Sequence, residues 1–469
     1  MPKDKGLASV NPLTVNDTIR ICRRVYWHAG EGTDTRVDRW LGIADASLSV
    51  GARELCCLVG VDNSFRKAAA RLRKLGQIAV SAERLRTVSE SEGVAMLRAR
   101  QDGRLRPDWD ASDCTVAGGK TQVLVGGDGV MVPVVTAAEK AKRRAGRGRV
   151  RRRGTNRTRR RRCRHRGADQ GWKAFKIGQF HSADKERCRA FATRGNHEEF
   201  GRQLRREAGR IALSKADQKF SVTDGAEWLR RQIRARLPML DEMIPDFYHF
   251  AEHVGGASAA CFGPETAASE TWTGKVLHAA KHTGPLTVLQ EIAATRPGVR
   301  ARHKRAALAI LEHYIAKRME MTDYPRFMAA GFDIGSGPTE AKCRTVPHRL
   351  KGSGMRWNLP NAEAMTALAC TEQSNMLTTY WALQRQQLTQ CQNLWAHPFA
   401  LSGGRTESTP VWYGFLGGGD EGGCGGGCGG GHFLEHEAAD GEDAALIRSV
   451  VCAPFMWVAG LSGRQARAA

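Results

Sequence analysis

Three acidic residues stand in sequence contexts that suit metal chemistry. Asp128 lies within "VLVGGDGVMV", Asp224 follows the short apolar run "KFSVT", and Glu340 comes directly after "GSGPT". Carboxylates that meet at one end of a sheet repel one another unless a cation joins them, and hard divalent cations prefer oxygen ligands. The three residues therefore predict a site for Mg²⁺ or Mn²⁺, the ions that promote phosphoryl transfer on nucleic acids.

The same acids also have an ordinary structural interpretation, because an Asp-Gly pair after a strand commonly forms a turn. The surrounding elements decide whether the acids can meet. Residues 121–135 and 172–182 have strand patterns, 219–233 indicates strand, turn and helix, and 244–254 starts as a short strand before a helix. This alternation predicts an α/β fold with a central sheet.

Helical spacing dominates the second half of the chain. Residues 251–330 contain no strand pattern and predict an all-helical insertion. Pro338 suits the first turn of a helix, which places Glu340 at a helix start. One further helix is predicted over 361–387.

Residues 50–90 predict two short helices joined by a tight turn, which is the pattern of a helix-turn-helix. The first has an apolar stripe from Phe65 to Leu75 and Gly76 as its left-handed end, and Ser81 can cap the second. Small helical bundles share this pattern, so DNA binding and plain packing both remain open for this unit.

Positive charge is concentrated in one segment. The formal net charge is +24, and residues 139–166 contain 16 Lys and Arg against a single Glu. Such dense like charge predicts a disordered arm that neutralises DNA phosphates without reading sequence, although a solvated linker is the alternative. The arginines expected to contact DNA are Arg151, Arg152, Arg153, Arg159, Arg160, Arg161 and Arg162.

The end of the chain is Gly-rich and acidic, which predicts a disordered tail that builds no core. Its Cys424, Cys428, His432 and His436 are evenly spaced and of the types that bind zinc, but the glycines offer them no packed support. The 13 cysteines lack the spacing of a disulfide framework, so we expect reduced thiols. No apolar run reaches the ~18 residues of a spanning helix, and the polar start is no secretory signal.

Six motifs, in order, carry a family resemblance. They are "GGDGVMVPVVTAAEKAKRR", "GADQGWKAFKIGQF", "VTDGAEWLRRQI", "DFYHFAEHV", "YPRFMAAGFDIGSGPTEAKC" and "RLKGSGMRW". Over about residues 35–388 the chain resembles the ISKra-type insertion-sequence transposases of bacteria. The resemblance implies an Asp-Asp-Glu transposase with a ribonuclease-H-like core, in which Asp128, Asp224 and Glu340 are the catalytic acids and metal ligands.

The motif "DFYH" resembles the Asp/Cys-x-x-His signature of Mutator-like relatives through Asp246 and His249. His249 would then orient a water or the scissile phosphate. In the alternative interpretation, Asp246 and His249 hydrogen-bond to each other and fix the junction between strand and helix.

Two further sites each have two interpretations. Arg349, Lys351 and Arg356 lie just past Glu340 among glycines, so they are predicted phosphate contacts or parts of a basic surface loop. Trp272, in the insertion, either stacks an extruded base or packs in a core.

These patterns predict a helical DNA-binding region at 1–100, the first part of the catalytic core at 115–250 with the basic arm at 139–170, the helical insertion at 251–330, the last part of the core at 331–390, and the tail at 391–469.

Members of the resembled family commonly begin with paired cysteines of a zinc ribbon, whereas the start of this chain has only Cys22. The tail also matches nothing in the family. Both departures point toward a decayed, inactive copy.

The expected function is a DNA transposase that cuts element ends and joins a freed 3′-hydroxyl to target DNA. It would act on double-stranded DNA as a homodimer or higher oligomer at the nucleoid of the bacterial cytoplasm, without a membrane partner. One alternative is a structure-selective nuclease on the same core, which would cut without joining. Another is a binding-only protein, in which the acids are structural and the arginine-rich arm coats nucleic acid.

Overall fold

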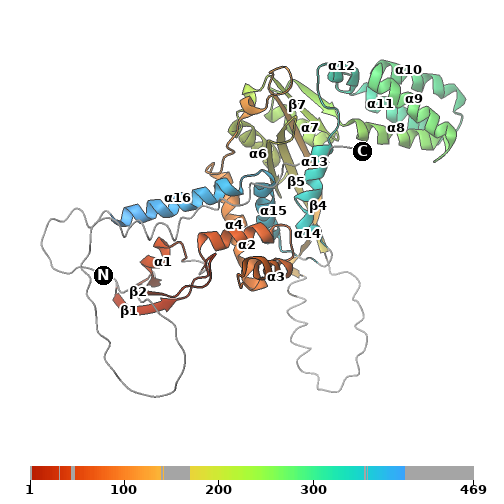
Figure 1. Ribbon diagram of the computed structural model, residues 1–469. Coiled ribbons are helices and arrows are strands. Elements are labelled where there is room, and N and C mark those ends of the chain that lie inside the picture. The colour runs from red at the N-terminus through yellow and green to blue at the C-terminus, as the bar shows by residue number, and fades with distance from the viewer. Residues whose placement is uncertain are drawn as a thin grey trace, which may run out of the picture. The chain divides into compact units, whose positions relative to one another are not determined.

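A mixed five-stranded sheet occupies the centre of the fold (Figure 1). The computed structural model describes residues 3–30, 32–43, 48–138, 141, 170–352, 355 and 357–396. The strands are β4 (Gln122–Val135), β5 (Gln170–Ser182), β6 (Cys188–Thr193), β7 (Gln218–Thr223) and β8 (Glu242–Pro245), in the order β6-β5-β4-β7-β8. β4, β5 and β6 pair antiparallel, whereas β7 and β8 run parallel to β4. The predicted α/β class is confirmed.

Strand β6 was not predicted from the sequence. All six of its residues, "CRAFAT", are buried. A strand buried on both faces loses the polar and apolar alternation by which a surface strand is recognised.

The two faces of the sheet contact different helices. Val123 and Val125 of β4 share a core with α6 (His197–Arg210) and α7 (Glu227–Arg236). On the other face, Val130 and Val132 share a core with α4 (Ala82–Gln101) and α15 (Leu359–Gln373). The strand is therefore covered on both sides, and its even-numbered residues point to the α15 face.

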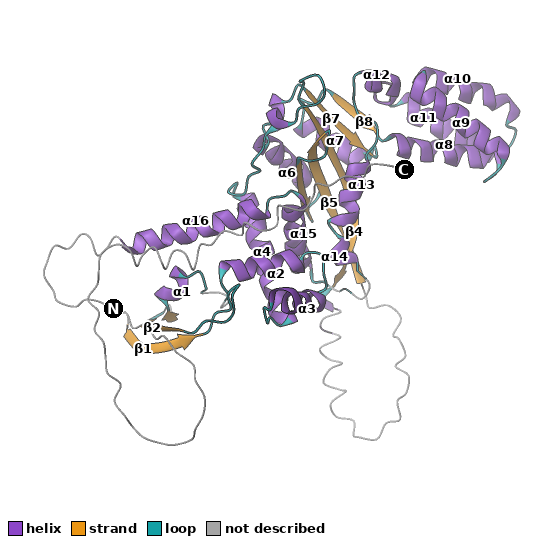
Figure 2. Ribbon diagram, in the orientation of Figure 1, coloured by secondary structure: helices purple, strands orange, loops and turns teal. Residues whose placement is uncertain are grey.

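An all-helical group follows β8, as the helical spacing predicts (Figure 2). Its helices are α8 (Phe247–Phe262), α9 (Ala267–His282), α10 (Pro285–Thr295), α11 (Arg302–Ala316) and α12 (Tyr324–Ala329). Their shared core includes Leu124, Phe220 and Ile244 of the sheet, so the insertion packs directly on β4, β7 and β8.

The N-terminal region differs from the helical prediction. It opens with an antiparallel sheet of β1 (Lys3–Val10), β2 (Ile21–His28) and β3 (Gly32–Asp34), followed by α1 (Arg36–Trp40), α2 (Val50–Gly60) and α3 (Phe65–Gly76). Ser81 caps α4 as predicted, accepting a hydrogen bond from the Arg84 N–H. The left-handed residue after α3 is Gln77, with φ 55°, and Gly76 is still helical.

The predicted two-helix unit continues into the main core. α4 extends to Gln101, and Val50 and Cys57 of α2 share a hydrophobic cluster with Met365 of α15. The helices between residues 50 and 101 are thus packed against the sheet assembly, which buries Ala68 and Leu72 of the predicted stripe but leaves Leu75 exposed.

The C-terminal end also differs from the prediction. The single helix expected over 361–387 is two, α15 and α16 (Leu377–Ala396), separated by Asn375 in the left-handed conformation at φ 55°. Asparagine tolerates this conformation better than most residues. The short helices α13 (Gly337–Thr345) and α14 (His348–Lys351) precede them, and four 3-10 turns are η1 (Ala111–Asp113), η2 (Leu213–Lys215), η3 (Arg296–Gly298) and η4 (Met319–Thr322).

Several predicted features lie outside the described residues. They are the basic arm with its seven named arginines, Arg356, and the tail from residue 397 with Cys424, Cys428, His432 and His436. Eight cysteines between Cys22 and Cys370, whose side chains the structure describes, are free thiols. Among the helices that can be described, none is long and apolar enough to cross a membrane.

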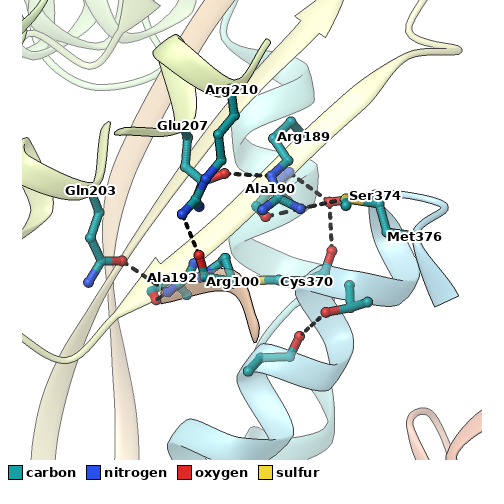
Figure 3. A network of polar contacts seen from close by, with 12 residues as sticks. Arg100, Arg189, Ala190, Ala192, Gln203, Glu207, Arg210, Cys370, Ser374 and Met376 are labelled. Atoms are coloured by element: carbon teal, nitrogen blue, oxygen red, sulfur yellow. Dashed lines mark hydrogen bonds and ion pairs between the residues drawn. The ribbon is translucent and has the colours of Figure 1, made fainter. Parts of the chain in front are cut away.

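A buried polar network joins β6 to the helices around it (Figure 3). The Arg189 Nε donates to Glu207 Oε2 at 2.6 Å, and Arg100 Nη2 donates to Gln203 Oε1 at 3.0 Å. Burial by itself raises the pKa of Glu207, but Arg189, Arg100 and Arg210 outweigh it and hold that pKa below its ordinary value. The Glu207 carboxylate thus pairs with the guanidinium groups of Arg189 and Arg210, and the charge of Arg100 adds to their effect.

Candidate active site

The sheet register places two of the predicted acids side by side. β4 and β7 are paired in parallel up to Val125 opposite Ser221. Continued three residues further along both strands, this register would place Asp128 level with Asp224, which directly follows β7. Both continue the face of Leu124 and Phe220, which are opposite one another and point into the same core. Neighbouring strands lie about 4.8 Å apart, so this register brings the two carboxylates to one place.

Glu340 reaches the same face because α13 lies directly against β4. Pro338 occupies the first turn and Glu340 follows within it, as predicted. A Cβ at Gly126 would lie only 1.9 Å from Thr339 Oγ1, so that only glycine allows this approach. The Gln179 amide of β5 also donates to Thr339 Oγ1 at 3.1 Å. The residue before Glu340 is therefore anchored two positions from Asp128.

The other two acids affect the pKa of Asp128. Burial raises the pKa of Asp128, and the carboxylates of Asp224 and Glu340 add to this increase, against the opposing Gly129 N–H and His249. The same three carboxylates also affect Cys343, which lies one turn after Glu340. Burial, together with all three carboxylates, raises the pKa of its thiol to about 12. The acids thus form one region of negative potential.

The hydrogen bonds of the three carboxylates are local. Asp224 Oδ1 accepts from the Ala226 N–H at 2.9 Å, so the expected Asp-Gly turn and the convergence of acids are both present. Asp128 accepts from the Gly129 N–H, and Glu340 Oε1 lies 3.4 Å from the Ser336 hydroxyl. Among the described residues, no Lys or Arg forms an ion pair with any of the three.

The donor set fits a hard cation in kind, since it consists of carboxylate oxygens without a cationic partner. Within the described residues, however, no group of three or more His, Cys, Asp or Glu side chains is close enough to hold a metal ion. Mg²⁺ in phosphoryl-transfer sites commonly uses one or two carboxylates and completes its shell with substrate phosphate. Asp128 and Asp224 are the residues that could supply such carboxylates.

Asp246 connects the strand β8 to the helix that carries Glu340. Its side chain is 1% exposed. Oδ1 caps α8 by accepting from the His249 N–H at 2.7 Å, and Oδ2 accepts from the Ser336 N–H at the start of α13. The structural interpretation therefore applies to Asp246, although its bond is to the backbone of His249 and not to the ring.

The His249 ring lies at the rim of the acidic region. Its Nδ1 is 3.2 Å from Glu252 Oε2 on the same helix. The imidazole also lowers the pKa of Asp128, which means that it is close enough to act on the site. The predicted role in orienting a water or phosphate stays open for this side chain.

Two predicted ligand-binding residues have structural positions. Arg349 is 6% exposed, and its guanidinium lies 4.6 Å from the ring centroid of Phe65 and 5.2 Å from that of Trp357. It is therefore not presented to DNA, because its cation is stacked inside the fold. Trp272 packs in the insertion core and donates to Thr295 Oγ1 at 2.8 Å, which confirms the core interpretation. Lys351 is exposed at the end of α14.

Sequence reasoning missed three residues of the insertion that border the acids. Tyr314 and Arg318 adjoin the Asp224-Gly225 turn, and the His253 ring lies 4.4 Å from that of Tyr314. About 90 positions separate Tyr314 from Asp224, and nothing in the local pattern "LEHYIAKRMEM" marks them. Only the packing of α11 on α8 reveals their position.

Comparison with family models and with curated proteins gives no match for this chain. The functional argument therefore depends on the site.

Proposed function

We propose that the protein is a metal-dependent DNA transposase of the ISKra type, and that its sheet is the core of a ribonuclease-H-like fold. One observation carries the proposal: the carboxylates of Asp224 and Glu340, from segments far apart in the chain, raise the pKa of Asp128, and all three acids raise that of the Cys343 thiol. Unpaired carboxylates so arranged destabilise a fold unless they serve a ligand, and a cation is the ligand that relieves their repulsion.

In this proposal, Asp128 and Asp224 hold Mg²⁺ or Mn²⁺ from neighbouring strands, and Glu340 approaches from α13. When bound, the cation stabilises negative charge on the attacking and leaving oxygens of a phosphodiester. Asp246 keeps the entry to α13 in place through Ser336. His249 and the exposed Lys351 supply positive or hydrogen-bonding groups at the rim, where a DNA strand would lie.

The test is cleavage of linear double-stranded DNA that carries the sequences flanking the coding region, with Mg²⁺ present and absent. The wild-type protein should cut at defined ends and join them to a second DNA. Asp224→Asn should lower the cleavage rate at least about 10²-fold, as loss of an electrostatic stabiliser does. DNA affinity, measured by fluorescence anisotropy, should stay within about twofold.

Glu270→Gln is the matched control, since it removes an exposed acid of α9 away from the site and should cleave normally. Cut DNA without joined product would favour the nuclease alternative. If neither protein cleaves DNA and Mg²⁺ changes nothing in the wild type or in Asp224→Asn, only the binding-protein alternative would remain.

A further inference from the structure

We propose that Tyr314 and Arg318 form a binding site for one DNA phosphate beside the Asp224-Gly225 turn. This inference rests on the proposed function and gives the helical insertion a direct part in it. Both side chains lie beside Gly225, whose φ is 78°. A Cβ built on Gly225 would lie 3.7 Å from Tyr314 Oη and 3.9 Å from Arg318 Nε. Both donors thus adjoin the turn that carries Asp224.

Both donors are buried and lack a partner. Tyr314 Oη and Arg318 Nε are among the buried polar atoms for which the structure shows no hydrogen bond. Buried donors are almost always satisfied, so two neighbouring exceptions call for a ligand that supplies acceptor oxygens. Arg318 forms no ion pair with Asp224 in the described part of the chain, so the carboxylate does not fill this role.

The two side chains are held in position before any ligand arrives. The Arg318 guanidinium lies 4.2 Å from the centroid of the Tyr314 ring, and its Nη1 donates to the Tyr314 carbonyl at 3.3 Å. On the opposite side, the His253 ring packs 4.4 Å from Tyr314, and His249 follows at 5.0 Å from His253. Packing fixes the ring and the guanidinium together, which lowers the entropy lost on binding.

The chemistry of this pair selects a phosphate. The guanidinium only donates hydrogen bonds, and the phenol hydroxyl can donate one, so both suit the acceptor oxygens of a phosphodiester. Arginine is favoured where a planar group must form two hydrogen bonds to a phosphate. Burial, with Asp224 and Asp246, raises the pKa of Tyr314 despite the opposing Arg318, so its hydroxyl keeps the proton that it donates. The acids alone would repel a DNA strand, and this pair offers attraction at the same edge.

The experiment is a phosphate-neutralisation scan without metal. End DNA that carries one methylphosphonate at a time, at each position in turn, is titrated with the protein by anisotropy in EDTA. For the wild type, we expect one position, at or beside the cut site, to weaken binding about 5- to 10-fold. Arg318→Met should lose that sensitivity and bind all DNAs with the same reduced affinity. Tyr314→Phe should lose part of it.

Lys317→Met is the control, because it removes a charge from an exposed neighbour and should leave the scan unchanged. Arg318→Lys should restore affinity only in part, since a single ammonium replaces the guanidinium fork. Thermal melting of each variant checks folding. The proposal would be overturned if folded Arg318→Met kept the wild-type sensitivity to the one methylphosphonate. It would also be overturned if Lys317→Met lost that sensitivity to the same extent.

The scan needs no cleavage, so the two proposals can fail separately. If the wild type never cuts DNA but Arg318→Met erases one phosphate contact, the transposase proposal fails and the phosphate site stands. If cleavage depends on Asp224 but the scan of Arg318→Met is unchanged, only the phosphate site fails.

Discussion

At the scale of single residues, the hydrogen bonds of each carboxylate distinguish an acid that could bind a metal ion from one that only holds the structure in place. Both oxygens of Asp246 accept backbone N–H groups, from His249 and Ser336, and its side chain is almost fully buried. The carboxylates of Asp128, Asp224 and Glu340 accept only local hydrogen bonds and repel one another. Asp246 is therefore a positioning residue, and the other three have oxygens to give to a ligand.

Asp246→Asn tests this positioning role. An amide cannot accept from both N–H groups, so one buried donor loses its partner, at about 1–3 kcal/mol of unfolding free energy. We expect cleavage to fall about 10- to 100-fold, as after loss of a supporting contact, while DNA affinity holds. Chemical denaturation and cleavage rates measure the two effects. Thr266→Ala, which removes the N-cap of α9, should cost stability without the loss of rate.

At the scale of elements, the approach of α13 to β4 decides whether the third acid belongs to the site. Gly126 and Gly129 lie on the same strand, on either side of Asp128. Thr339 occupies the space at Gly126, whereas a Cβ at Gly129 would meet nothing within 4 Å. The approach of α13 thus requires a glycine at position 126 but not at position 129.

Gly126→Ala should therefore displace α13, and Gly129→Ala should not. Overpacking of this kind costs about 1–3 kcal/mol, and any shift of Thr339 also moves Glu340. We expect a lower melting temperature and at least a 10-fold loss of cleavage for Gly126→Ala. Gly129→Ala should keep both, because the backbone N–H that binds Asp128 remains. Equal behaviour of the two variants would show that α13 does not position Glu340.

What the sequence could predict follows from the range of the interactions. Pro338, the cap at Ser81 and the strand patterns of β4, β5, β7 and β8 are local, and each was predicted correctly, whereas β6 and the N-terminal strands β1 to β3 were not predicted. Arg349 was misread because its stacking partner Phe65 is far away in the chain. The continuous apolar pattern of 361–387 likewise hid a break that depends on a single left-handed Asn375. The local contexts of the acids left a shared metal site and ordinary turns as alternatives, and the family resemblance favoured the shared site.

At the scale of the whole molecule, one buried carboxylate joins parts of the chain that the sequence treats as separate domains. Glu207 of α6 is paired with Arg189 of β6 at 2.6 Å and also with Arg210, and Arg100 of α4 acts on it (Figure 3). The same strand β6 is tied to the helix pair α15 and α16, because the Ala190 N–H donates to the Ser374 hydroxyl at 2.8 Å. Stability of the N-terminal helices, sheet and C-terminal helices is thus coupled at this point.

The coupling predicts how stability depends on pH. The pKa of Glu207 is lower in the folded protein than its ordinary value of 4.5, so the ionised carboxylate stabilises the fold fully above that pH. This contribution is lost as the pH falls through the folded pKa, where the group takes up a proton. Glu207→Gln should remove it at every pH, lowering the unfolding free energy at pH 7 by about 3–5 kcal/mol, since Arg189 and Arg210 lose their ion-pair partner. Denaturant titrations from pH 3 to 7 should therefore show that the difference in unfolding free energy between wild type and Glu207→Gln narrows in acid.

Glu270→Gln, which changes an exposed residue, should follow the pH dependence of the wild type. A difference for Glu207→Gln that stays constant with pH would mean that the network does not depend on this charge.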